Sequence, residues 1–120
     1  MRRKPNTLLP LEADILNAGM ALQRRGARQF YGFQLAKQLA DAADARRLTA
    51  HGTLYKALGR LDGRGLLAST WEDPQVAADA GRPRRRLYEV TGAGERALAQ
   101  WRIMHDGATV HALRRGLEPT

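Results

Sequence analysis

The sequence predicts a mainly α-helical fold with a small β-hairpin wing, that is, a winged helix-turn-helix with one additional C-terminal helix. Two segments indicate this arrangement. Residues 52–61 (GTLYKALGRL) have the pattern of an amphipathic helix whose outer face carries cations. Residues 81–91 (GRPRRRLYEVT) have the pattern of an arginine-rich turn that enters a strand. A helix that fits a groove, beside a basic hairpin that reaches a backbone, is typical of winged-helix DNA binding.

Two helices are expected before the third, cationic one. Pro10 suits the first turn of a helix, and the apolar residues from there on recur at helical spacing: Leu11, Ile15, Ala18 and Leu22. This first helix is expected to end at residues 24–26. A second helix is expected from residues 31–32 to residues 42–44, with a buried face formed by Tyr31, Leu35 and Leu39.

The third helix is expected from Thr49, a suitable N-cap, to about residue 63. Leu54, Leu58 and Leu61 recur at helical spacing and are predicted to face the core. The opposite face then carries three glycines and two cations: Gly52, Lys56, Gly59, Arg60 and Gly63. Each interior glycine costs a helix about 1 kcal/mol relative to alanine. Two interpretations stay open, namely a tolerant solvated face or a face that approaches a groove closely.

A β-hairpin is expected after the third helix. Residues 66–71 are predicted to form its first strand, residues 72–74 a turn, and residues 75–83 a polar loop. Residues 86–90 alternate with period two and are expected to pair with the first strand, with Tyr88 and Val90 facing the core. This hairpin is the predicted wing.

Thr91 is expected to cap a last helix, whose apolar edge is formed by Leu98, Trp101 and either Met104 or His105. The same edge can continue through Val110, Leu113 and Leu117. The chain is thus expected to consist of a basic N-terminal arm (1–7), a winged helix-turn-helix DNA-binding domain (8–91) and a C-terminal dimerisation helix with its tail (92–120).

The charge indicates a polyanionic partner. Twenty Lys and Arg against twelve Asp and Glu give a formal net charge of +8 in 120 residues. An excess of this size on a small surface favours nucleic acid first and an acidic membrane surface second. No apolar run approaches the ~20 residues that span a bilayer, and no signal core follows the basic start. We therefore expect a cytoplasmic protein without a membrane partner.

Enzyme chemistry is not predicted. Ser69 is the only serine, and the chain has no cysteine to act as a nucleophile or metal ligand. His51, His105 and His111 lack the spacing of metal ligands and have no carboxylate cluster beside them. We expect no catalytic residue, no metal site and no cofactor.

Residues 8–98 resemble the PadR-type transcriptional regulators. The resemblance depends on the order and spacing of YGFQL (31–35), GTLY (52–55), GLL (65–67) and RRRLY (84–88). It implies a homodimer that binds an inverted-repeat operator in double-stranded DNA and represses a nearby gene, often one for detoxification or efflux. Gly59 and Gly63 depart from the family pattern, in which bulkier polar residues are usual.

The resemblance and the charge pattern together place the DNA contacts on the third helix and the wing. Base-edge contacts are expected from the helix and phosphate contacts from the wing. For Tyr55, a position packed under the wing is an open alternative. The candidate DNA-binding residues are Thr49, His51, Gly52, Thr53, Tyr55, Lys56, Arg60, Arg82, Arg84, Arg85 and Arg86.

The first and last helices are expected to form the dimer interface or an effector pocket, through Leu11, Ile15, Leu98, Trp101 and Met104. Trp101 fits either of two interpretations: an ordinary interface or core tryptophan, or part of an aromatic wall for a small aromatic or drug-like effector. The alternative function is a winged-helix module that binds a partner or a ligand and has little affinity for DNA.

Overall fold

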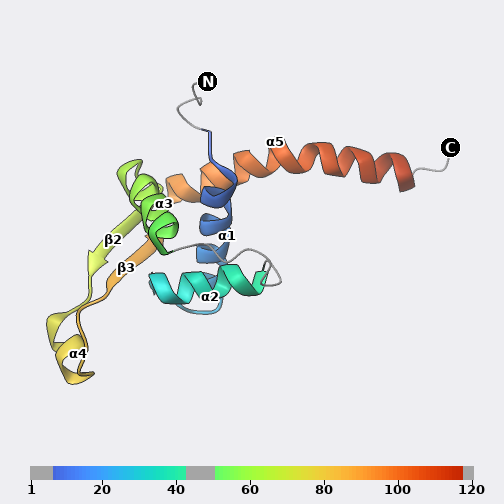
Figure 1. Ribbon diagram of the computed structural model, residues 1–120. Coiled ribbons are helices and arrows are strands. Elements are labelled where there is room, and N and C mark those ends of the chain that lie inside the picture. The colour runs from blue at the N-terminus through green and yellow to red at the C-terminus, as the bar shows by residue number, and fades with distance from the viewer. Residues whose placement is uncertain (1–6, 43–50, 118–120) are drawn as a thin grey trace.

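The computed structural model describes the backbone of residues 7–42 and 51–117, and the side chains of residues 7–41 and 52–105. Thr49 and residues 1–6 of the predicted arm lie outside these ranges. Figure 1 shows the order of the elements, which are α1 (Pro10–Arg24), β1 (Phe30–Tyr31), α2 (Gly32–Ala42), α3 (His51–Gly63), β2 (Leu67–Trp71), α4 (Pro74–Asp79), β3 (Arg86–Val90) and α5 (Gly92–Leu117).

The three strands form one antiparallel sheet in the order β1-β3-β2. In its register Leu67 lies opposite Val90, and Phe30 lies opposite Tyr88. Tyr88 and Val90 are buried, so the period-two prediction for β3 is confirmed. The short strand β1 was not predicted, because two residues are too few to show a period.

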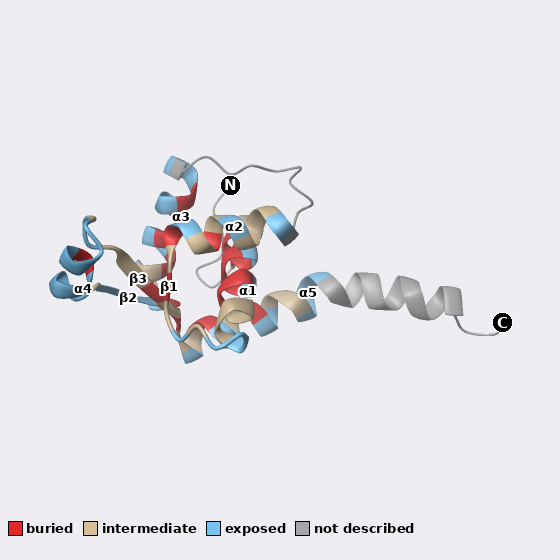
Figure 2. Cartoon of the chain, turned by 90° about the horizontal axis from the view of Figure 1, so that it is seen from below, coloured by how far each residue is buried: buried red, intermediate tan, exposed pale blue. Residues whose placement is uncertain are grey.

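Helix α1 lies at the centre of the domain and packs against α2, α3, α5 and β3. The buried residues gather around it, as Figure 2 shows, and include Ile15, Leu16 and Phe30. Leu54, Leu58 and Leu61 of α3 are almost fully buried, which confirms their predicted inward orientation. Three helices followed by a β2–β3 hairpin form a winged helix-turn-helix, so the predicted fold class is confirmed.

The polar loop predicted for residues 75–83 is wrong over its first part, because α4 occupies the end of the wing (Figure 1). The Asp73 carboxylate accepts a hydrogen bond from the Gln75 amide at 2.8 Å, and Pro74 fills the first helical turn. Asp before Pro is a helix-start signal in its own right. Ala77 is buried and holds this short helix against the wing.

Helix α5 begins at the base of the wing and projects away from the body of the domain, as Figure 1 shows. The Thr91 hydroxyl accepts a hydrogen bond from the Gly94 amide at 3.0 Å, which confirms the predicted cap. The same hydroxyl donates to the Gly65 carbonyl at 2.7 Å and thereby ties the start of α5 to the turn before β2. None of the described helices is both long enough and apolar enough to cross a lipid bilayer.

The outward glycines of α3 are not required by packing. A Cβ added at Gly52, Gly59 or Gly63 would meet no described atom within 4 Å. At Gly94, by contrast, a Cβ would overlap the Leu66 carbonyl. The close packing of α5 on the turn before β2 therefore needs a glycine, whereas the outer face of α3 does not.

We expect Gly59→Ala to raise the free energy of unfolding by about 1 kcal/mol, because alanine restricts the unfolded chain and meets no neighbour in the helix. Gly94→Ala is the matched control and is expected to lower it by about 1–3 kcal/mol through overpacking. Urea denaturation followed by circular dichroism measures both. An equal effect of the two substitutions would contradict this description of the glycines.

Candidate nucleic-acid interface

The outer face of α3 presents the side chains that the sequence assigned to a groove. Thr53, Tyr55 and Lys56 are exposed, as is the backbone at Gly52. The side chain of His51 is outside the described set. Because Leu54, Leu58 and Leu61 anchor the opposite face in the core, the exposed face has a fixed orientation.

Arg60 lies on the same outward face, yet its guanidinium reaches back to α1. Its Nε donates to the Glu12 carboxylate at 2.8 Å, and Arg64 Nη1 lies 3.6 Å from the other oxygen. Glu12 is fully buried, and it also accepts a hydrogen bond from the Leu9 amide at 2.8 Å. A buried carboxylate requires such partners, so Arg60 fixes the position of α3 on α1. Periodicity places Arg60 on the helix but cannot show this partner 48 residues away.

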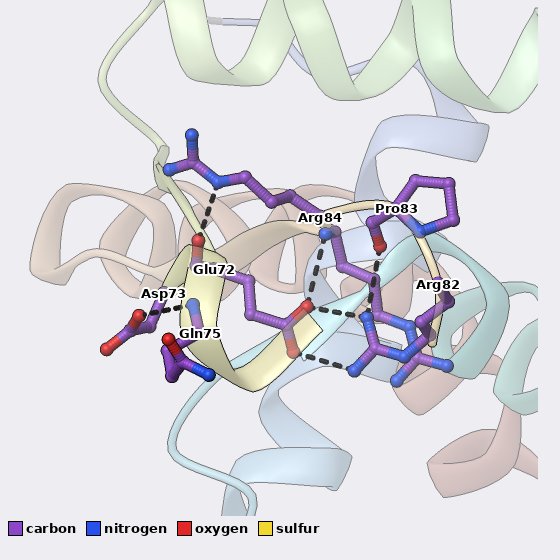
Figure 3. Close-up of polar contacts among 7 residues, drawn as sticks. Glu72, Asp73, Gln75, Arg82, Pro83 and Arg84 are labelled. Carbon is purple, nitrogen blue, oxygen red and sulfur yellow. Dashed lines mark hydrogen bonds and ion pairs between the residues drawn. The ribbon is translucent and has the colours of Figure 1, made fainter. Parts of the chain in front are cut away.

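Glu72 organises the wing, as Figure 3 shows. Its carboxylate accepts two hydrogen bonds from the Arg82 guanidinium, at 2.6 and 2.9 Å. The same carboxylate accepts a hydrogen bond from the Arg85 amide at 3.3 Å, while the Glu72 carbonyl accepts one from Arg84 Nε at 2.9 Å. The basic turn is thus folded around one acidic residue. Arg82, predicted to contact DNA, is held within the wing.

The hydrogen bonds from Arg82 lower the pKa of Glu72 from 4.5 to about 2. Partial burial opposes this shift, and the Arg85 amide and the charges of both arginines reinforce it. The carboxylate is therefore ionised throughout the neutral and mildly acidic range.

Three wing arginines lie over aromatic rings. The Arg85 guanidinium is 4.0 Å from the centroid of the Tyr31 ring. Arg84 and Arg86 lie 5.7 and 5.0 Å from the Trp71 ring, and Arg86 also donates to the Ser69 hydroxyl at 2.8 Å. Cation–π contacts of this kind hold the guanidinium groups while their N–H groups can still bind an anion.

A hollow of about 680 Å³ separates the wing from α2 and α3. It is lined by four aromatic residues, three arginines and one glycine: Tyr31, Phe33, Tyr55, Trp71, Arg84, Arg85, Arg86 and Gly32. A Cβ at Gly32 would overlap the Tyr55 ring, so this ring lies directly over the start of α2. Tyr55 is nonetheless 48% exposed.

The structure brings Tyr55 and three of the predicted wing arginines to one hollow, beside exposed Lys56. The sequence did not assign Trp71 or Phe33 to the site, and Tyr31 was expected on the buried face of the second helix. Tyr31 lies in β1 instead and is half-buried. The available signal was the pair of aromatic residues at 31 and 33 together with Trp71 at the end of the first predicted strand and the arginine run at 84–86.

The predicted interface residues divide into two groups. Ile15 and Leu98 lie inside the core of the single chain, where a partner cannot reach them. Leu11 and Trp101 are half-buried, and Met104 is 66% exposed. The Trp101 ring stacks on the His105 ring at a centroid distance of 4.1 Å, and its Nε1 has no hydrogen-bond partner among the described residues.

We expect Arg60→Ala to lower the free energy of unfolding by about 2 kcal/mol, because it removes a charged hydrogen bond from a buried carboxylate. Lys56→Ala, on the same exposed face, is the matched control and should change stability by at most ~0.5 kcal/mol. Chemical denaturation measures both. Equal stability of the two variants would show that Arg60 has no structural role.

The Glu72 carboxylate is expected to titrate near pH 2. Its folded pKa is depressed, so the stabilisation is complete above the ordinary value of 4.5 and is lost as the pH falls through about 2. In Arg82→Ala the titration midpoint should return toward 4.5. Carbon-13 NMR of the side-chain carboxyl measures the midpoints, and an unchanged midpoint in the variant would exclude Arg82 as the main cause.

Comparison with known proteins identifies the family. The model of the transcriptional regulator PadR-like family matches residues 22–100. A PadR family transcriptional regulator from Eggerthella lenta is 30% identical, with 87% of this chain and 97% of that chain covered and a TM-score of 0.51. A PadR-like transcription factor from Bacteroides fragilis is 25% identical, with 87% of each chain covered and a TM-score of 0.64.

A transcriptional regulator from Clostridium thermocellum has the same fold at 19% identity, with 90% of this chain and 93% of that chain covered and a TM-score of 0.64. No curated protein matches the chain significantly. The family consists of DNA-binding regulators of transcription and not of enzymes. With the family model matching well over half of its length, the chain belongs to the PadR-like family of transcriptional regulators.

Proposed function

We propose that this regulator represses transcription in the cytoplasm, as a homodimer that binds an inverted-repeat operator in double-stranded DNA. The observation that carries the proposal is the contiguity of two surfaces. Tyr55 of α3 and Arg84, Arg85 and Arg86 of the wing line one hollow, so the exposed face of α3 and the basic turn lie side by side.

The two surfaces have different roles in this proposal. Helix α3 enters the major groove, where Thr53 and Lys56 reach base edges and phosphates. The arginines of the basic turn bind the sugar-phosphate backbone beside it. Arg60 and Arg82 have mainly a structural role in this proposal, since each is bound by a carboxylate of the chain itself. Arg60 fixes the position of α3, and Arg82 fixes the basic turn.

The proposed dimer interface lies on α5 and the adjoining part of α1. Helix α5 has 26 residues and projects from the body of the domain, and its first half presents exposed Ile103 and Met104 beside half-buried Trp101. Apolar side chains on a projecting helix favour pairing with a second copy. Two α3 helices related by a two-fold axis would then enter successive major grooves, about 34 Å apart.

A small aromatic or drug-like effector is proposed to act near Trp101. The stacked Trp101 and His105 rings offer a flat apolar wall, and the indole Nε1 is a buried donor without a partner among the described residues. Such a donor favours a ligand, or a second copy of the chain, that supplies an acceptor. A ligand placed there would alter the contact between the two copies and thereby release the operator.

The DNA-binding proposal predicts a division between base and phosphate contacts. Lys56→Ala should reduce the preference for an operator over unrelated duplex, by about tenfold for one good base contact. Arg84→Ala should weaken all duplexes alike and make the salt slope shallower by about 0.9 per lost phosphate contact. Mobility-shift titrations at two salt concentrations, on operator fragments selected from genomic DNA, measure both effects. The control variant is Lys37→Gln, which removes an exposed cation on α2 that is not among the candidate DNA-binding residues.

A chain that ignores duplex DNA at low salt would overturn this proposal. It would favour the alternative, a winged-helix module that binds a partner or a ligand. The internal pairing of Arg60 and Arg82 supports that alternative, because a carboxylate of the chain itself already balances the charge of each of these two predicted DNA-binding cations.

The dimer proposal predicts that Met104→Glu converts the protein to a monomer, because two carboxylates would be buried at the apolar interface. Sedimentation equilibrium measures the mass, and Val76→Glu is the control, since Val76 is an exposed apolar residue on α4 at the wing tip. A Met104→Glu variant that still sediments as a dimer would place the interface elsewhere.

A further inference from the structure

We propose that the hollow between the wing, α2 and α3 binds one free nucleotide, whose base stacks on the aromatic rings and whose phosphate meets the wing arginines. This site is distinct from the Trp101 region. Its regulatory consequence rests on the proposed DNA-binding function, because the same arginines would serve both ligands.

The aromatic part of the hollow is unusually open. Phe33 is 66% exposed, Trp71 56% and Tyr55 48%, although each is large and apolar. Three such rings from α2, β2 and α3 gather around one hollow. Single exposed apolar residues are ordinary, but exposed rings that share a concave surface mark a ligand site. Base stacking on such rings tolerates any base, because every base has a π-face.

The charged side chains that line the hollow are all cationic. Arg84, Arg85 and Arg86 line it, and none of the eight lining residues carries a carboxylate. The carboxylate within the turn, Glu72, is already bound by Arg82. Guanidinium groups bind phosphate oxygens through paired N–H donors, so the hollow selects an anion rather than a neutral ring.

The two parts together define the ligand. A bare phosphate would leave the exposed parts of the three rings in water, and a neutral aromatic compound would leave the three guanidinium groups without an anion. Duplex DNA offers phosphates, but its bases are stacked on each other and their faces are not available. A mononucleotide has both a free ring face and a phosphate, and the volume of about 680 Å³ lies within the range of small-ligand sites, roughly 300–1,000 Å³.

The backbone at the start of α2 supports the Tyr55 ring. The Tyr55 ring lies so close to Gly32 that a Cβ there would displace it. The Tyr31 amide donates to the Gln34 side chain at 3.1 Å, which fixes the turn from β1 into α2. The Tyr55 ring is therefore held in place before a ligand arrives, which lowers the entropic cost of binding.

The experiment is isothermal titration calorimetry of the full chain without DNA, with AMP, GMP, CMP and UMP. The expected result is one nucleotide per chain. The tightest nucleotide should bind at least tenfold more tightly than its nucleoside or ribose 5-phosphate.

The variants Trp71→Ala, Phe33→Ala and Arg86→Gln should each weaken nucleotide binding by tenfold or more. Lys37→Gln, which removes an exposed cation outside the hollow, should leave nucleotide binding unchanged. Phe33 is the most exposed of the rings, so its variant tests the site without risk to folding.

Two results would overturn the inference. Ribose 5-phosphate that binds as tightly as the nucleotides would show attraction by charge alone. A single-stranded hexanucleotide that binds more than tenfold more tightly than every mononucleotide would show that the hollow binds single-stranded nucleic acid instead.

Displacement of labelled duplex by the nucleotide then tests regulation. If duplex binds and nucleotides do not, only this inference fails. If nucleotides bind and duplex does not, the proposed DNA-binding function fails while the site stands. If both bind together without competition, the regulatory part is wrong.

Discussion

The fold depends most on the buried carboxylate of Glu12. It begins α1 by accepting a hydrogen bond from the Leu9 amide, and it holds α3 by accepting one from Arg60. A fully buried charge without partners would cost several kcal/mol, so the first and third helices must meet in one orientation. Leucines alone would permit neighbouring packings of similar energy, whereas a charged hydrogen bond of 2.8 Å does not.

Glu72 has the corresponding role in the wing. The two carboxylates explain why the net charge of +8 is a poor measure of the charge available to a partner. Each one binds a cation that the sequence placed on the interface. Lys56 and the arginines at 84–86 remain at the interface. Their positions depend on the two internal pairs, because Arg60 fixes α3 and Arg82 fixes the basic turn. Interior pairing thus sets the geometry of the exposed charge.

Local patterns predicted most of the fold and less of the site. Helices α1, α2 and α3, the hairpin strands and the Thr91 cap follow from periodicity and helix-start residues, which are properties of neighbouring positions. The Glu12–Arg60 contact joins residues 48 apart, and no local pattern contains it. The aromatic hollow was missed for the same reason, since Phe33 and Trp71 meet only after the sheet forms. Helix α4 was missed although Asp73 and Pro74 signalled its start.

The connection between β3 and α5 has a mechanical consequence. Strand β3 ends at Val90 and α5 begins at Gly92, and the Thr91 hydroxyl bridges to the turn before β2. Only Thr91 separates the strand from the long helix. Because Val90 and Leu98 are buried and β3 pairs with both β1 and β2, a tilt of α5 about its base would have to carry the sheet and its hairpin with it.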